Sequence, residues 1–280
     1  MRKAEVFQSN FMRAASVGIL LGITCATGWA QGTAGGPLTI TLAGQSMIRS
    51  DTRATAPKAI PVIQGLLKGD VVFSNFEAAV AEKGQSVTEG RGFLTPPEAL
   101  DAMTTFGFNM LSFSGNHAFD LKATGVQNTL READARKIVH AGTGNNLAEA
   151  AAPAYMKTPK GTIAMIASAS GLIAPGGKAT ADGPGVNELR IKAGDKDNEA
   201  TADIPNSPGN TPNAEDAKRI LDSIREARTK ADIVIVYQHN HIFSNHSFTN
   251  VFTEGLQERL APNEWLVKWV HAEVDAGRNG

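Results

Sequence analysis

The sequence predicts an α/β protein in which strands and helices alternate and build a largely parallel or mixed sheet. Short runs rich in Val, Ile and Phe recur between stretches whose apolar residues have helical spacing. The 280 residues are 42% hydrophobic and 20% charged, so the chain can bury a sizeable core. The sequence contains no internal repeat.

Six runs of apolar and β-branched residues are typical of strands: 38–43, 70–74, 108–114, 138–140, 162–168 and 232–238. Five segments have the apolar spacing of helices: 57–68, 95–106, 121–137, 213–230 and 262–276. Because helices connect most of the strands, we expect crossovers that cover both faces of the sheet.

Local chemistry sets the boundaries of these elements. The first strand stops at Gly44. Thr95, followed by Pro96 and by Glu98, predicts a capping box at the start of the second helix. Residues 171–212 are rich in Gly, Pro, Asn and Asp, which indicates a long surface excursion with a short strand near 186–191.

The first thirty residues, 1–30, have the pattern of a secretory signal peptide. Basic residues precede an uncharged stretch over 14–30, and small residues follow it. We predict cleavage after Ala30, which leaves one domain over 31–280 in the periplasm or outside the cell. An uncleaved membrane anchor is disfavoured because the stretch is short and rich in Gly and Thr. A lipoprotein linked through Cys25 is disfavoured by the poor lipobox before it.

Composition excludes several classes of site. Lys and Arg number 27 and Asp and Glu 28, so no global positive field favours nucleic-acid binding. Cys25 is the single cysteine, which rules out a disulfide framework, a cysteine zinc site and an iron–sulfur cluster in the mature chain. Any metal must therefore bind to nitrogen and oxygen ligands.

Polar clusters stand directly after four of the predicted strands: Gly44-Gln45-Ser46, Asn75-Phe76-Glu77, Gly115-Asn116-His117 with Asp120, and His239-Asn240-His241. Singly, each has a structural explanation as a turn, a helix cap or a surface pair. Ligands in open α/β sheets bind at the carboxyl ends of strands, so their common position favours one shared site. Imidazole, carboxylate and amide groups together suit Zn, Mn or Fe.

The motifs also resemble a known family. They are Asp70-x4-Asn75-Phe76-Glu77, Gly107-Phe108-Asn109 leading to Gly115-Asn116-His117-x2-Asp120, and Thr143-Gly144-Asn145-Asn146 with Glu149-Ala150 and Pro153. As a set, from about Leu38 to Gly277, they resemble the CapA family of bacterial capsule and poly-γ-glutamate synthesis proteins. That family is related to the calcineurin-like metallophosphoesterases.

The resemblance implies a four-layer α/β sandwich with mixed sheets and a dinuclear metal site, or its remnant, at the strand ends. Glu77 would be the bridging carboxylate, with Asn116 and His239 as further metal ligands. His117, oriented by Asp120, would be the acid that protonates the leaving group. Additional candidates at the same edge are Gln45, Asn75 and His241.

The sequence departs from the family pattern in two places. The family usually has Gly-Asp where this chain has Gly44-Gln45, and a neutral amide is a poorer ligand than a carboxylate. A later histidine-containing loop is also absent. Because a further strand is expected after the helix over 262–276, we predict a domain truncated at its C-terminus.

Three functions compete at this point. The first is an exported hydrolase acting on a cell-envelope or capsular polymer, with divalent Mn, Fe or Zn as cofactor. The second is a non-catalytic envelope protein that binds the polymer or assists membrane-associated synthesis machinery, which Gln45 favours. The third is a periplasmic solute-binding protein, which would not need histidines at its strand ends. We expect no nucleic-acid partner.

Overall fold

The computed structural model describes residues 36–87, 92–193, 196–198, 209–242 and 262–278. All of them belong to one unit, Ala34–Gly280. The predicted signal peptide over 1–30 lies outside the described residues, as do parts of the predicted excursion. In the part of the chain that is described, no helix is both long enough and apolar enough to cross a bilayer.

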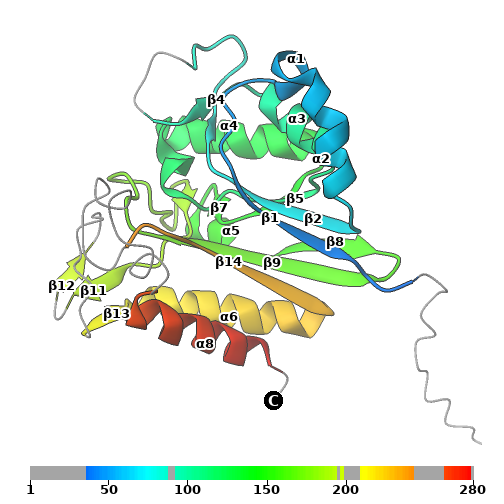
Figure 1. Cartoon of the computed structure of the whole chain (residues 1–280). Coiled ribbons are helices and arrows are strands. Elements are labelled where there is room, and N and C mark those ends of the chain that lie inside the picture. The colour runs from blue at the N-terminus through cyan, green and yellow to red at the C-terminus, as the bar shows by residue number, and fades with distance from the viewer. Residues whose placement is uncertain (1–35, 88–91, 194–195, 199–208, 243–261, 279–280) are drawn as a thin grey trace, which may run out of the picture. The chain divides into compact units, whose positions relative to one another are not determined.

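Four parallel strands form the first sheet, in the order β1-β2-β5-β6 (Figure 1). They are β1 (Ile40–Ser46), β2 (Val71–Phe76), β5 (Met110–Ser112) and β6 (Val139–Ala141). Each matches a strand that the sequence predicts, with ends shifted by a few residues. Because the strands are parallel, their carboxyl ends lie at one edge of the sheet.

The second sheet is mixed and has the order β14-β9-β8. Its strands are β8 (Ala154–Thr158), β9 (Gly161–Ser170) and β14 (Ile233–Asn240). The long strands β9 and β14 run parallel, whereas β8 pairs with β9 as an antiparallel hairpin. The sequence predicts β9 and β14 but not β8.

The longer helices are α2 (Ile60–Leu66), α3 (Glu98–Phe106), α4 (Lys122–Ala135), α6 (Ala214–Lys230) and α8 (Glu264–Gly277). The short ones are α1 (Thr52–Thr55), η1 (Pro57–Ala59), η2 (Asn116–Phe119) and α5 (Leu147–Ala151). The five predicted helices correspond to the longer set, with η1 opening the segment that continues as α2.

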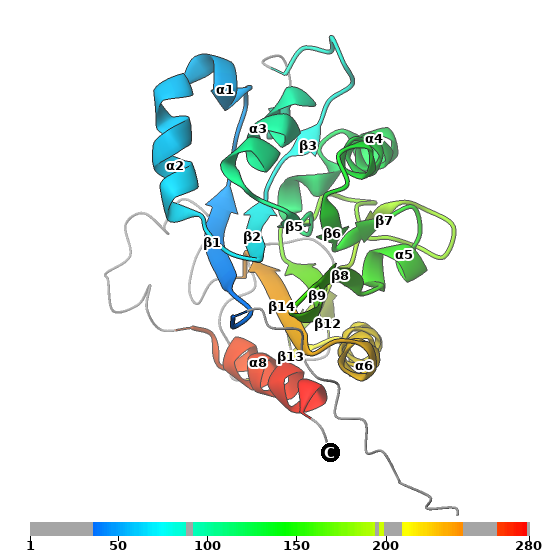
Figure 2. The same cartoon turned by 90° about the vertical axis from the view of Figure 1, so that its right-hand side faces the viewer.

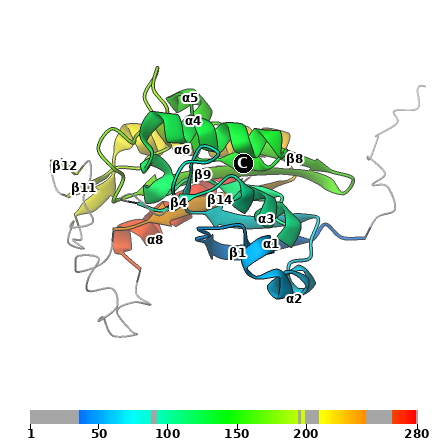
Figure 3. The ribbon, with the colours of Figure 1, turned by 90° about the horizontal axis from the view of Figure 1, so that it is seen from above.

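Helices and sheets are arranged in layers (Figures 2 and 3), and three hydrophobic clusters hold these layers together. Side chains of α3 and α4 pack on one face of the first sheet, around Val72 and Leu111. The other face packs against the second sheet, where Phe73 shares a cluster with Met165. On the outer face of the second sheet, α6 and α8 pack around Ile166. The α/β class with mixed sheets is thus confirmed, while the likeness to the metallophosphoesterase sandwich stays a prediction.

One sequence prediction needs correction. Thr95 does not cap a helix, because it pairs with Val80 in the short parallel strands β3 (Ala79–Val80) and β4 (Leu94–Thr95). Helix α3 starts at Glu98 after Pro97, which makes no side-chain cap. The described residues of the segment 171–212 include the short strands β10 (Gly185–Val186), β11 (Ile191–Ala193), β12 (Lys196–Asn198) and β13 (Asn210–Pro212). Strand β10 pairs with β7 (Thr143–Gly144). The surface excursion over 171–212 stays a prediction.

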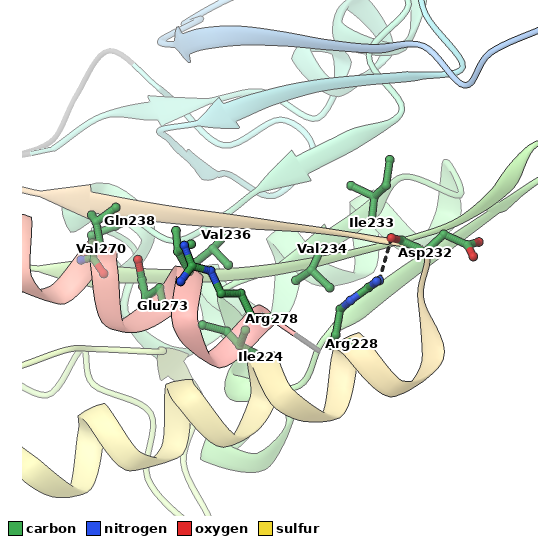
Figure 4. A pocket seen from close by; sticks show the side chains of 12 residues that line it. Ile224, Arg228, Asp232, Ile233, Val234, Val236, Gln238, Val270, Glu273 and Arg278 are labelled. Carbon is green, nitrogen blue, oxygen red and sulfur yellow. Dashed lines mark hydrogen bonds between the residues drawn. The ribbon is translucent and has the colours of Figure 1, made fainter. Parts of the chain in front are cut away.

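A cavity of about 660 Å³ lies between β14, α6 and α8 (Figure 4). Val234, Val236 and Gln238 line it from β14, and Val270 and Glu273 line it from α8. Side chains alternate along a strand, so this cavity faces away from Tyr237 and His239 on the same strand.

Candidate metal centre

The structure brings together polar residues from the ends of both sheets. Glu77 follows the last residue of β2, and His239 lies near the end of β14, with His241 just beyond it. Asn116 starts the η2 turn that follows β5. Because the two sheets face each other, these ends meet at one edge of the sandwich.

Glu77, His239 and His241 have the spacing of a metal-binding cluster. Their ligand atoms lie within 4.8 Å of one another. Oε1 of Glu77 is 3.9 Å from Nε2 of His239 and 4.0 Å from Nε2 of His241. A single cation placed among them would meet two imidazole nitrogens and one carboxylate oxygen, a donor set that suits Zn, Mn or Fe.

Burial prepares these three groups for a cation. Glu77 is 3% exposed, and its Oε2 has no hydrogen-bond partner in the described part of the chain. Burial raises the pKa of Glu77 to about 7, because the charged form loses hydration. Burial also lowers the pKa of His239 to about 3 and that of His241 to about 4. Both rings are therefore neutral near pH 7, as metal ligands must be.

Asn116 lies directly beside this cluster. Its Oδ1 is 3.0 Å from Nε2 of His239, the nitrogen that faces Glu77. The predicted ligands Glu77, Asn116 and His239 thus converge, and His241, an additional candidate in the sequence, belongs to the same group.

His117 and Asp120 form a pair at the rim of the cluster. Nδ1 of His117 lies 2.6 Å from Oδ2 of Asp120, and its Nε2 is 3.9 Å from Oε1 of Glu77. The hydrogen bond to Asp120 raises the pKa of His117 despite the partial burial of the ring. An imidazole with one nitrogen held and the other facing the cluster can donate a proton near neutral pH.

Asp120 is held by a loop that approaches it closely. The backbone N–H of Phe93 donates to Oδ2 of Asp120 at 2.6 Å. A Cβ on the preceding Gly92 would lie 2.3 Å from the same oxygen, and Gly92 has φ +118°. Only glycine fits this backbone conformation and this close contact without strain.

Asn75 is linked to the cluster through the hydroxyl of Tyr237. In the amide orientation that satisfies its neighbours, Asn75 donates to the carbonyl oxygens of Ser112 and Ser114 and accepts from the hydroxyl of Tyr237. That hydroxyl lies 3.3 Å from Nδ1 of His239. Sequence reasoning missed Tyr237, although its position two residues before His239 on a strand placed it on the same face.

Gln45 lies at the same sheet edge but outside the three-residue cluster. It stands opposite Asn75 in the register of β1 and β2, and its side chain is exposed. The group of Glu77, His239 and His241 contains no residue of β1.

Comparison with known proteins gives two findings. The family described as "Bacterial capsule synthesis protein PGA_cap" matches residues 39–277. Two proteins of Sinorhizobium fredii (strain NBRC 101917 / NGR234), the uncharacterized proteins y4sH and y4uA, are each 29% identical over 143 residues. The match covers 47% of this chain but only 31% of either relative. The relatives are thus much longer than the part that this chain matches.

Proposed function

Because the chain belongs to the PGA_cap family of bacterial capsule synthesis proteins, we propose that it is an exported, metal-dependent hydrolase acting on a capsular or other cell-envelope polymer. The observation that carries the proposal is the buried Glu77 carboxylate, which faces two neutral imidazoles and lies beside the His117–Asp120 pair. Such a set of groups is typical of metal-assisted hydrolysis. The predicted signal peptide supports export to the periplasm or beyond.

The donor set fits a divalent cation, because Oε2 of Glu77 is buried without a hydrogen-bond partner among the described residues. Glu77, His239 and His241 would hold the ion, with the amide oxygen of Asn116 next to them. A bound Mn, Fe or Zn ion would lower the pKa of a water molecule and stabilise an oxyanion.

The other residues act on protons and orientation. His117 donates a proton from Nε2 to the leaving group, because its Nδ1 is engaged by Asp120. Asp120 fixes the imidazole and stabilises its protonated form. The N–H of Phe93 holds Asp120 in turn. The bond that such a site cleaves is a phosphoester or an amide of the polymer.

Metal analysis of the purified chain, followed by assays with a chromogenic phosphodiester and with poly-γ-glutamate, tests the proposal. Wild type should contain a divalent metal and hydrolyse one of these substrates, and a chelator should abolish the activity. Glu77→Gln should lose metal and activity together, because the substitution removes the buried negative charge. Glu226→Gln is the matched control, since Glu226 is half-exposed on α6.

A second function, polymer binding without catalysis, is favoured by one observation. The exposed neutral Gln45 stands where the family resemblance leads one to expect a carboxylate ligand. On this alternative, the protein would bind the polymer or assist membrane-associated synthesis machinery. Metal-free, inactive wild type that still binds poly-γ-glutamate would support it over the hydrolase.

A further inference from the structure

Arg49 lies outside the cluster of Glu77, His239 and His241 but close to the His117–Asp120 pair. The side chain of Arg49 is exposed in the segment after β1, and Cζ of its guanidinium lies 4.0 Å from the centroid of the Phe93 ring. Its Nη2 donates to the carbonyl oxygen of Gly92 at 3.2 Å. Arg49 is thus held on the loop whose next N–H binds Asp120.

The arginine is also close to the proposed proton donor. Both residues are near Phe93, whose ring centroid lies 4.0 Å from Cζ of Arg49 and 6.0 Å from the ring centroid of His117. The hydrogen bond to Asp120 raises the pKa of His117, and the positive charge of Arg49 is near enough to oppose that rise. Arg49 therefore lies on the Phe93 side of the His117–Asp120 pair, whereas Nε2 of His117 faces Glu77.

The positive charge of Arg49 is not used within the described fold. Among the described residues its partners are a carbonyl oxygen and an aromatic face, and it makes no ion pair with a carboxylate. A guanidinium has five N–H donors, and stacking on a ring leaves its edge available. Such a restrained edge is suited to bidentate contact with two oxygens of one anionic group.

We propose that Arg49, held by Phe93 and Gly92, binds an oxyanion of the substrate next to the group that reacts. The inference rests on the proposed function and adds the substrate class: the polymer carries a carboxylate or a phosphate adjacent to the scissile bond. A stacked guanidinium loses little conformational entropy on binding. Its positive charge favours anionic over neutral substrates.

The test measures binding by the full chain loaded with Mn²⁺. Two probes distinguish the source of the oxyanion: a short γ-linked glutamate oligomer and inorganic phosphate. The same oligomer with its carboxylates amidated is the neutral control. Calorimetry should show that wild type binds at least one anionic probe, and that Arg49→Gln weakens this binding about 10- to 100-fold, the range for a lost charge-assisted hydrogen bond.

Further variants separate recognition from a purely structural role. Arg49→Lys should bind with intermediate affinity, because it keeps the charge but not the planar fork. Arg225→Gln, at an exposed arginine of α6, controls for net charge and should bind like wild type. With a hydrolysed substrate, Arg49→Gln should raise KM and leave kcat and the metal content nearly unchanged.

The outcomes separate this inference from the proposed function. If wild type hydrolyses nothing but Arg49→Gln still loses affinity for an anionic probe, the hydrolase proposal fails and the oxyanion site stands. If wild type binds neither probe, or if Arg49→Gln binds both as tightly as wild type, the oxyanion site is wrong. Equal affinity for the amidated oligomer also overturns it.

Discussion

The hydroxyl of Tyr237 lies 3.3 Å from Nδ1 of His239, whereas Nε2 of the same ring faces Glu77. Asn75 accepts from the same hydroxyl, so the hydroxyl proton of Tyr237 points to Asn75. A lone pair of the Tyr237 oxygen then faces His239. His239 then carries its proton on Nδ1 when Nε2 binds a cation. This buried relay fixes both the tautomer and the orientation of a predicted ligand.

Replacing Tyr237 by Phe should weaken metal binding about 10- to 100-fold, the usual effect of losing a hydrogen bond to a metal-bound imidazole. Competition with a chromogenic chelator measures the affinity. Tyr155→Phe is the matched control, because the buried hydroxyl of Tyr155 has no hydrogen-bond partner in the described structure. Equal metal affinities of the two variants would show that the relay does not act on His239.

His117→Asn should lower the rate of hydrolysis by about two to four orders of magnitude, the range for a lost general acid, while metal stays bound. The reason is that His117 lies at the rim of the cluster and is held by Asp120. Parallel measurement of kcat and of metal content in His117→Asn and Glu77→Gln checks the assignment. Loss of metal in the histidine variant, with retention in Glu77→Gln, would reverse the two roles.

Sequence periodicity located the strands that have a run of apolar and β-branched residues, edge strands included, but not β8. The predicted strand over 162–168 lies within β9, where Ile163 and Met165 are fully buried. The adjacent β8 has no fully buried residue, and its sequence AYMKT lacks the run of branched apolar side chains that marks the other strands. Its strand structure comes from the hairpin with β9, which is a tertiary effect.

The site was predictable residue by residue but not as a three-dimensional arrangement. Strand ends marked Glu77, Asn116 and His239 as candidates, because polar groups follow apolar runs there. Glu77 and His239 nevertheless belong to different sheets, and no local pattern says that the two sheets face each other. Arg49 could not be identified as a site residue for the same reason, since its partner Phe93 is more than forty residues away in the sequence.

Asp216 should be important for stability. This buried carboxylate at the start of α6 accepts from Lys178, Arg190 and Arg219, and so joins the helix to the segment before it. Burial raises its pKa, but the hydrogen bonds from the three cations outweigh burial and bring the pKa down to about 2. Asp216→Asn should lower the free energy of unfolding by about 3 kcal/mol at pH 7, because it removes the buried negative charge that three partly buried cations share.

The lowered pKa of Asp216 also predicts how its contribution to stability changes with pH. The folded pKa of Asp216 is below the unfolded value of 3.8, so its contribution is complete above about pH 4 and is lost as the pH falls toward 2. Urea denaturation at pH 7 and at pH 3 should therefore show a smaller difference between wild type and Asp216→Asn at the lower pH. Asp222→Asn, at an exposed carboxylate on the same helix, should change stability by less than about 1 kcal/mol.

Glu273 should have the opposite dependence on pH. This side chain of α8 is 5% exposed at the cavity between β14, α6 and α8, and its Oε1 has no hydrogen-bond partner in the described structure (Figure 4). Burial raises its pKa from 4.5 to about 7. Because the folded state holds this proton more tightly than the unfolded state, the stability that the proton provides is lost as the pH rises through 7.

Glu273→Gln removes the cost of ionising this buried group and keeps its shape. The variant should match wild type near pH 4 and exceed it at pH 8 by about 3 kcal/mol in the free energy of unfolding, since each pKa unit corresponds to about 1.4 kcal/mol. Urea denaturation at both pH values measures the difference. Glu264→Gln on the exposed side of the same helix is the control and should follow wild type at both. If Glu273→Gln and wild type keep a constant difference from pH 4 to pH 8, Glu273 does not titrate in this range and its burial does not limit the stability of the α8 layer.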